Sequence, residues 1–244
     1  MANIIELIDV NFSAQHGKVL SDVNVGFLEG KTTAIVGPSG GGKSTVLKIA
    51  AGLLVPDDGE ILYKNENIAH MNRVENLVFR RETAFVFQDS ALWANQNIYQ
   101  ILDLPLRIHY PQMTTKERFS RIKEVTGEVG YRRDLEIRPS RLSMGEQKLI
   151  AFARALLCKP SLLFLDEWTE SLDESSSERL IEIVKRKQKD GFTILFISHD
   201  MKLILDLADH VIIIAEGKVS LEAPKDNVIH ELLIRDFLKI GIAS

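Results

Sequence analysis

A glycine-rich segment early in the chain has the residue types and spacing of a phosphate-binding loop. Residues 37–44 read Gly-Pro-Ser-Gly-Gly-Gly-Lys-Ser, which fits the pattern G-x-x-x-x-G-K-[S/T]. Glycines allow successive backbone N–H groups to point at one anion, and the start of the following helix adds partial positive charge. We expect Lys43 to reach the β- and γ-phosphates and Ser44 to place its hydroxyl on Mg²⁺. The residues assigned to the phosphates are Gly37, Pro38, Ser39, Gly40, Gly41, Gly42, Lys43, Ser44 and Thr45.

Two adjacent carboxylates follow an apolar run later in the chain. Residues 162–165 have the composition of a buried strand, and Asp166 and Glu167 come directly after it. Side chains at the carboxyl end of a parallel strand emerge where α/β folds bind their ligands. We expect Asp166 to hold Mg²⁺ through water and Glu167 to act as the general base that orients the attacking water. Without the phosphate-binding loop, the same pair would read as ordinary polar turn residues.

Polar residues also end two other predicted strands. Gln88 follows the run at residues 84–87, where its amide could bind Mg²⁺ or water, although a glutamine at a strand end is more often structural. His199 follows the run at residues 193–197, from which its imidazole could reach a γ-phosphate oxygen or the attacking water. Gln88 and His199 therefore join Glu167 and Lys43 as candidate catalytic residues.

The segment Leu-Ser-Met-Gly-Glu-Gln at residues 142–147 precedes an apolar-periodic helix. Ser143 stands at the expected N-cap, and Glu146 follows at the spacing of a capping box. Capping explains these residues completely. However, a serine hydroxyl and the N–H of Gly145 at a helix start also form an anion site, and one chain on its own needs no second one.

The composition excludes several protein classes. With 30 Lys and Arg against 34 Asp and Glu, the 244-residue chain has a net charge of −4, which does not suggest a nucleic-acid-binding surface. No apolar run is long enough to span a bilayer, and the N-terminus lacks the pattern of a secretory signal. The single cysteine cannot form a disulfide within the chain. We expect a cytoplasmic protein with no direct membrane span.

The pattern of elements predicts an α/β fold. Residues 1–90 contain short β-rich runs at 4–12, 22–27, 32–36, 60–63 and 84–87, with one helix beginning after Gly42. Residues 91–140 are mostly helical in pattern, and the last hundred residues alternate helices with continuous apolar strands, as in a parallel sheet covered on both faces. We therefore predict a P-loop NTPase core with a mostly parallel sheet, an N-terminal antiparallel β portion and a helical insertion.

Together these motifs resemble the ATP-binding cassette (ABC) ATPases in order and spacing, from about Ile4 to about Ala223. The resemblance rests on the phosphate loop, Gln88, Leu-Ser-x-Gly, Leu-Asp-Glu, Ser-Leu-Asp and Ile-Ser-His-Asp. It implies a single cassette over residues 1–244. The core and antiparallel portion would occupy roughly 1–90 and 160–225, the helical subdomain roughly 91–159, and a C-terminal helix roughly 226–240.

In that family two cassettes pair head to tail, and each ATP lies between the phosphate loop of one and the Leu-Ser-Gly-Gly-Gln signature of the other. The resemblance therefore implies that Ser143 and Gly145 contact the partner's ATP, which supplies the use for a second anion site. It also implies Mg²⁺ bound by Ser44, Gln88 and Asp166, a catalytic Glu167 and a switch histidine at His199. Asp173, assigned with them to the nucleotide site, matches the loop that communicates across the dimer.

The sequence departs from the family pattern in three features. Met144 and Glu146 replace a glycine and the glutamine of the signature, so that the side chain of Met144 either weakens closure or points away from the phosphate. Trp168 stands where a proline is usual, which we expect to alter packing more than chemistry. The aromatic residue that stacks on adenine should fall at Ala14, with Phe12 or His16 as the nearest substitutes, so nucleotide affinity would depend mainly on the phosphates.

The resemblance further implies the energy subunit of a transporter whose membrane domains are separate chains. Such subunits receive a short helix of the membrane partner near residues 88–93, and would lie peripherally on the inner face of the cell membrane. The residues from Phe87 to His109 are similar to the cassettes of mammalian-cell-entry-type lipid transporters, but amino-acid, ion and lipoprotein systems remain alternatives. Two other classes also remain: an ATP-gated dimerising cassette with little hydrolysis, and a P-loop kinase.

Overall fold

The computed structural model of the chain describes residues 2–15 and 17–228. It contains two compact units: Met1–Asn67 with Leu195–Ser244 form the first, and Ile68–Ile194 form the second. Each unit is described by itself below. The predicted C-terminal helix at about 226–240 lies mostly outside the described residues, and the predicted subdomain limits stay a prediction.

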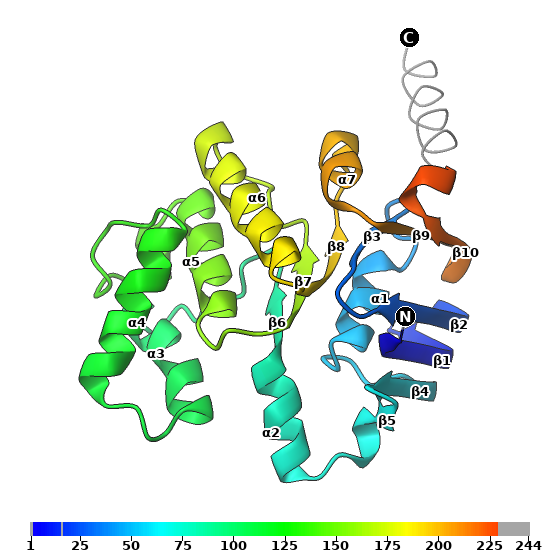
Figure 1. Cartoon of the computed structure of the whole chain (residues 1–244), viewed down its shortest axis with the longest axis horizontal. Helices are drawn as coiled ribbons and strands as arrows, with labels where there is room; N and C mark the ends of the chain where they lie inside the picture. The colour runs from blue at the N-terminus through cyan, green and yellow to red at the C-terminus, as the bar shows by residue number, and fades with distance from the viewer. Residues whose placement is uncertain (1, 16, 229–244) are drawn as a thin grey trace. The chain divides into compact units, whose positions relative to one another are not determined.

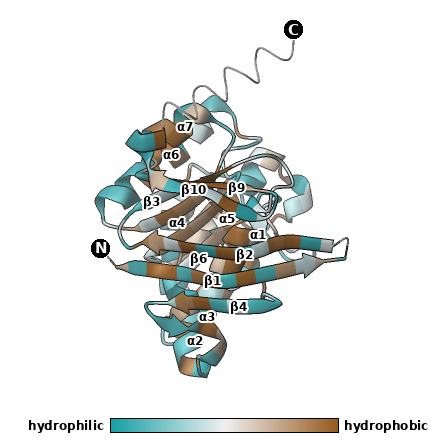
Figure 2. Cartoon of the chain, turned by 90° about the vertical axis from the view of Figure 1, so that its right-hand side faces the viewer, coloured by the Kyte–Doolittle hydropathy of each residue, from teal (hydrophilic) through white to brown (hydrophobic). Residues whose placement is uncertain are grey.

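The first unit contains an antiparallel sheet in the order β2-β1-β4-β5. Its strands are β1 (Asn3–Ala14), β2 (Gly17–Leu28), β4 (Asp58–Tyr63) and β5 (Glu66–Asn67). Figure 2 shows apolar and polar segments alternating along β1 and β2, and the side chains of Ile5, Leu7 and Val10 are buried. This half-buried alternation is typical of a sheet with one face on a core. The predicted antiparallel β portion is confirmed.

The first unit also contains the strands around the phosphate loop, although the first two residues of β8 belong to the second unit. β10 (Lys218–Pro224), β9 (His210–Ala215), β3 (Thr32–Val36) and β8 (Thr193–Ile197) are neighbours in that order. β3 and β9 are parallel, with Val36 opposite Ile213. Every residue of β3 and β8 is buried, which explains why both strands appear in the sequence as continuous apolar runs. Helices α1 (Lys43–Ala50) and α7 (Met201–Leu207) complete the unit (Figure 1).

The second unit combines a parallel strand pair with helices. β6 (Thr83–Val86) and β7 (Leu162–Asp166) pair so that Val86 lies opposite Leu165. Helices α3 (Ile98–His109), α4 (Thr115–Glu128) and α5 (Met144–Leu156) pack on one another, and Figure 1 shows them side by side. The unit also contains α6 (Glu174–Lys189) and 3-10 turns at Ile68–His70 and Pro139–Arg141. The predicted helical middle of the chain is confirmed.

The prediction of a single helix before residue 90 is wrong, because α2 (Arg73–Glu82) is a second one. Phe79 is its buried residue, whereas Val74, Leu77 and Val78 are exposed, so the helix lacks the buried apolar stripe that identifies most helices in a sequence. Asn72 and Glu75 form a capping box that begins it. That spacing was the available sequence signal.

Within the described part of the chain, none of the helices combines the length and the apolar character that crossing a bilayer requires.

Candidate nucleotide-binding site

The phosphate loop follows β3 directly and packs against β9 within the first unit. A Cβ at Gly37 would lie 2.0 Å from the carbonyl oxygen of Ile214, and Gly37 has a φ of 140°. Gly42 has a φ of 102° and would bring a Cβ within 2.7 Å of the Leu20 side chain. Both positions therefore require glycine. Because Gly42 is also the N-cap of α1, no side chain of the cap covers the start of this helix, which leaves the geometry that favours an anion there.

Lys43 is buried at the base of the loop. Its ammonium group donates hydrogen bonds to the carbonyl oxygens of Gly37, at 3.0 Å, and Pro38, at 2.9 Å. The lysine therefore links the two ends of the loop by hydrogen bonds. A bound phosphate could replace these carbonyl oxygens as the hydrogen-bond acceptor of the ammonium group. Ser44 and Thr45 follow in the first turn of α1.

His199 lies in the same unit, just after β8, which neighbours β3. It is exposed, whereas Ser198 before it is buried. The Asp200 N–H donates to the Ser198 hydroxyl oxygen at 3.0 Å, and Asp200 caps α7 through the N–H of Lys202 at 2.8 Å. The backbone on both sides of His199 is thus fixed while its imidazole stays accessible.

In the second unit, Gln88 and the two carboxylates leave the sheet at the same edge. Val86 lies opposite Leu165 in a parallel pair, so Gln88 and Glu167 each come two residues after paired positions. Asp166 and Glu167 are both buried, and Gln88 is exposed. The amide nitrogen of Gln88 donates to a carboxylate oxygen of Glu170 at 3.1 Å. The structure therefore places Gln88, Asp166 and Glu167 at the same edge of this strand pair, and their predicted roles stay a prediction.

Glu167 has a backbone conformation that few non-glycine residues adopt, with a φ of 45°. Such strain is retained where the surrounding structure fixes it and is concentrated at functional sites. The next residue, Trp168, is fully buried, and its ring centroid lies 5.6 Å from that of Phe152 on α5. Trp168 thus supports the strained turn by packing against Phe152.

Lys148, a residue that the sequence did not indicate, connects these two segments. It lies on α5, is 2% exposed, and donates hydrogen bonds to the carbonyl oxygens of Phe87 at 3.2 Å, of Gln88, and of Glu167 at 3.5 Å. Burial lowers its pKa, while nearby carboxylates act in the opposite direction, namely Glu170, Asp166, Asp89 and Glu167. Lys148 therefore holds the loop after β6 against the loop after β7.

Arg154, further along α5, supports the same loop. Its guanidinium donates to the carbonyl oxygens of Ala91 at 2.7 Å and Ser90 at 3.2 Å. Ser90 and Ala91 have φ values of 63° and 45°. Without such donors, the carbonyl groups of this turn would lose their partners. Sequence reasoning could not find Lys148 or Arg154, because most of their acceptors, in residues 87–91, lie about sixty residues away in the chain.

We expect Lys148→Met to lower both stability and turnover. The substitution leaves one buried and two partly buried carbonyl oxygens without this donor, which costs about 2 kcal/mol of unfolding free energy, and it releases Gln88 from the Glu167 turn. Urea denaturation and phosphate release from ATP measure the two effects. The control is Lys116→Met, which changes an exposed lysine on α4. Unchanged stability and turnover in Lys148→Met would contradict the role of this lysine.

The signature segment begins α5. Ser143 is its exposed N-cap: the Ser143 hydroxyl oxygen accepts the Glu146 N–H at 3.1 Å, and Glu146 accepts the Ser143 N–H at 2.9 Å. The predicted capping box is therefore present. Met144 is 71% exposed, so a side chain at this position points into solvent in the single chain. Gly145 differs, because a Cβ there would lie 3.0 Å from the carbonyl oxygen of Ser171.

We expect Gly145→Ala and Gly127→Ala to change stability in opposite directions. Both glycines are helical, and alanine is the better helix former by about 1 kcal/mol. A Cβ added at Gly127 in α4 would meet nothing within 4 Å, so its replacement should stabilise the protein. At Gly145 the added methyl must displace the turn at Ser171, so we expect a net loss. Urea denaturation of the pair measures the difference, and equal stabilisation by both would contradict the close packing at Gly145.

Asp173 is the N-cap of α6. Its carboxylate accepts the Ser176 N–H at 2.9 Å and the hydroxyl groups of Ser176 and Ser175 at 2.7 and 2.8 Å. These hydrogen bonds, with that of the Ser176 hydroxyl the strongest, lower the pKa of Asp173 to about 2. The structure therefore gives Asp173 a capping role and holds its charge at neutral pH. Its predicted role at the nucleotide stays a prediction.

The expected adenine position lies at the end of β1. Ala14 is exposed and pairs with Gly17 across the β1–β2 hairpin, while Phe12 is partly buried two residues earlier. His16 lies outside the described residues. Ala14 offers no ring for stacking, so Phe12 is the described aromatic side chain of this segment.

Comparison with known proteins identifies the family to which this chain belongs. The family model described as ABC transporter matches residues 20–170. The chain belongs to the ABC transporter family. This ABC cassette is 33% identical over 220 residues to the intermembrane phospholipid transport system ATP-binding protein MlaF of Escherichia coli strain K12, a match covering 90% of this chain and 81% of MlaF. It is 35% identical over 210 residues to the nickel import ATP-binding protein NikE of Shigella flexneri serotype 5b, covering 84% of this chain and 78% of NikE.

Solved structures agree with the family. The dimeric post-hydrolysis state of the ATP-binding cassette MJ0796, bound to ADP and Pi, aligns with a TM-score of 0.82 and 30% identity, covering 90% of this chain and 98% of that one. The ABC ATPase fold is therefore confirmed. So is the prediction that the chain is an ABC-type ATPase and an ATP-binding subunit of a transporter. Membership of this family sets aside the P-loop kinase alternative.

Proposed function

We propose that this ABC cassette hydrolyses ATP with Glu167 as the general base and drives a transporter whose membrane-spanning part is a separate chain. The main support for this proposal is the arrangement of residues at the edge of the β6–β7 pair. There a buried, strained Glu167 stands beside Asp166 and Gln88, and Lys148 joins the loops that carry them. In the first unit, Lys43 and the phosphate loop would hold the triphosphate, and His199 would contact the γ-phosphate or the attacking water.

The chemistry of Ser44, Gln88 and Asp166 fits Mg²⁺. A hydroxyl, an amide oxygen and a carboxylate are the hard oxygen donors that this ion prefers. The described residues contain no group of three or more His, Cys, Asp or Glu side chains that could hold a metal by themselves. The remaining ligands would then be water and phosphate oxygens, which is how Mg²⁺ is usually bound beside nucleotides. When bound, the ion would neutralise charge on the phosphates; Gln88 would contribute its amide oxygen, since its nitrogen donates to Glu170.

We further propose that two copies, or this chain and a related cassette, close head to tail on two ATP molecules. Ser143 supports this, because its hydroxyl oxygen is an acceptor within the capping box while its proton remains available to donate to an anion. The N–H of Gly145 and the exposed surface at Met144 belong to the same helix start. The similar cassette MJ0796 has been solved as a dimer.

The surface near residues 88–93 is our proposed docking site for the membrane partner. Trp93 is 45% exposed, and a nearby pocket is lined by Gln96, Tyr99, Gln100, Asp103, Leu104 and Arg107. The cassette would lie on the inner face of the cell membrane through this contact. The similarity to MlaF favours a lipid substrate, while the similarity to NikE keeps an ion as the alternative.

A phosphate-release assay on the purified protein, with and without Mg²⁺, tests the enzymatic part of this proposal. The second candidate function is an ATP-gated cassette that dimerises with little hydrolysis, which the substituted signature favours. Mg²⁺-dependent release well above that of a Glu167→Gln blank supports hydrolysis. ATP-dependent dimers in sedimentation without release above the blank would instead support the second candidate.

A further inference from the structure

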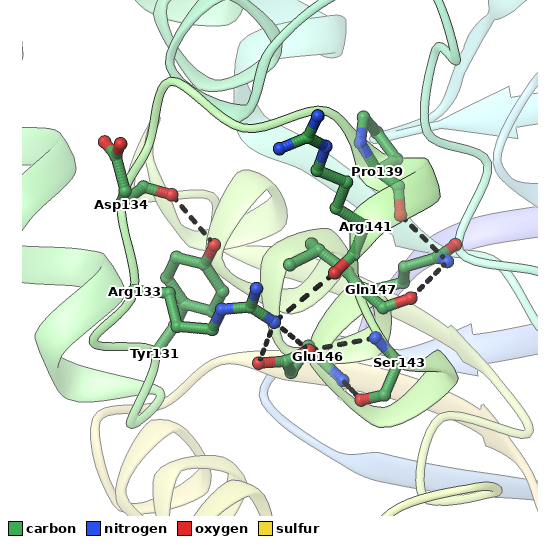
Figure 3. A network of polar contacts seen from close by, with 9 residues as sticks. Tyr131, Arg133, Asp134, Pro139, Arg141, Ser143, Glu146 and Gln147 are labelled. Carbon is green, nitrogen blue, oxygen red and sulfur yellow. Dashed lines mark hydrogen bonds and ion pairs between the residues drawn. The ribbon is translucent and has the colours of Figure 1, made fainter.

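The helix start that we propose to face the partner's ATP carries a carboxylate. Glu146 lies in the first turn of α5, with one oxygen 2.9 Å from the N–H of Ser143 (Figure 3). A carboxylate here stabilises the helix, because its negative charge interacts favourably with the positive end of the helix dipole. The same negative charge repels an arriving triphosphate. The helix start therefore needs a nearby positive charge if it is to serve as an anion site.

Arg133 supplies a positive charge to this carboxylate. One terminal nitrogen of its guanidinium donates to both oxygens of Glu146, at 3.0 and 2.9 Å, and also to the carbonyl oxygen of Arg141 at 3.4 Å (Figure 3). The segment that presents Arg133 is itself held, since the Tyr131 hydroxyl donates to the carbonyl oxygen of Asp134 at 3.1 Å. This one nitrogen is thus shared between the two carboxylate oxygens of Glu146.

The ionisation of the pair is consistent with this geometry. Burial acts to raise the pKa of Glu146, but hydrogen bonds from the Ser143 N–H and from Arg133 outweigh it and hold the pKa below its usual value. The hydrogen bond with Glu146 raises the pKa of Arg133. Both groups are therefore charged at neutral pH, and the pair has no net charge.

We propose that Arg133 is a positioning residue for nucleotide-driven closure: it cancels the charge of Glu146, so that Ser143 and Gly145 can receive the γ-phosphate of a second copy's ATP. The inference rests on the proposed role of Ser143 and Gly145 in the dimer. It adds a specific requirement to that role, namely that Glu146 is tolerated at this helix start only while Arg133 accompanies it.

The simpler explanation is an ordinary surface ion pair that adds slightly to the stability of α5. Half of the Arg133 side chain and 26% of that of Glu146 are exposed, and exposed ion pairs contribute little to stability. The two explanations differ in what they predict for ATP-dependent association of the protein. Removal of a structural ion pair changes unfolding, whereas removal of a counter-charge changes ATP-dependent association through a repulsion that salt screens.

A charge cycle tests the inference. Arg133→Gln leaves Glu146 uncompensated, and we expect the ATP concentration needed for half-maximal dimer formation and hydrolysis to rise about three- to tenfold at low salt, and less at high salt. Glu146→Gln keeps the capping box and removes the charge, so we expect the double variant Arg133→Gln/Glu146→Gln to regain the wild-type value. The control is Arg186→Gln, which breaks a comparably exposed ion pair with Glu128 in the same unit.

Sedimentation with and without ATP, hydrolysis rates and thermal unfolding of each variant separate the outcomes. An Arg133→Gln protein that matches Arg186→Gln in its ATP dependence would overturn the inference. The proposed function would still stand in that case if the wild-type protein forms an ATP-dependent dimer. A double variant as defective as Arg133→Gln would also overturn it. If the wild-type protein forms no ATP-dependent dimer, closure between two copies of this chain and the inference are both wrong, and only the pairing with a related cassette is left of the proposed closure.

Discussion

Replacing Glu167 by Gln should reduce phosphate release from ATP by about a hundredfold or more, the range expected for loss of a general base, while ATP binding persists. The substitution preserves the shape of the side chain and its fit in a site where only 7% of Glu167 is exposed. It removes the basic oxygen that would accept a proton from the attacking water. Since binding is retained and turnover is not, the ATP-bound dimer should accumulate.

Three measurements check this expectation: phosphate release, nucleotide titration and sedimentation in Mg-ATP. Glu178→Gln is the matched control, because it changes an exposed carboxylate of α6 in the same unit. The control should hydrolyse at the wild-type rate and dissociate as turnover proceeds. Hydrolysis by Glu167→Gln at the wild-type rate would remove this residue from the role of base and direct attention to His199 or Gln88.

The sequence predicted most accurately the strands that are buried along their whole length. β3 and β8 are buried along their whole length, so each appears as an uninterrupted apolar run, and both were predicted with the observed limits. Helix α2 was missed because its stability depends on a capping box and on Phe79 rather than on an apolar stripe. Local sequence pattern reports the burial of an element, and α2 buries too little of itself to be found that way.

The candidate site was predictable where chemistry imposes a spacing. The phosphate loop needs its glycines and lysine at fixed intervals, and Asp166 and Glu167 must follow a strand. Lys148 and Arg133 follow no such spacing. Lys148 donates hydrogen bonds to carbonyl oxygens just after β6 and β7, and Arg133 donates to Glu146, thirteen residues away in the chain. Residues that support a site through backbone acceptors or a single ion pair become visible only in three dimensions.

The second large effect concerns Lys43, whose replacement by Ala should weaken nucleotide binding. Its ammonium group donates to the carbonyl oxygens of Gly37 and Pro38, and the residue is only 7% exposed within the loop that it closes. A phosphate that enters the loop would take over this charged donor. A hydrogen bond to a charged group contributes about 1.5–3 kcal/mol, so we expect affinity for ATP to fall about ten- to a hundredfold.

Nucleotide titration of Lys43→Ala measures this loss, with Lys48→Ala as the control. Lys48 lies on the same helix but in its last turn, away from the loop. Because Lys43 also bonds the loop carbonyls, its loss should lower the unfolding temperature even without ATP, and the stabilisation that ATP gives the wild-type protein should largely disappear. A variant that loses hydrolysis but binds ATP with unchanged affinity would contradict the binding role. Lys43 would then act on the transition state alone, through charge that develops on the γ-phosphate as the bond to the leaving group breaks.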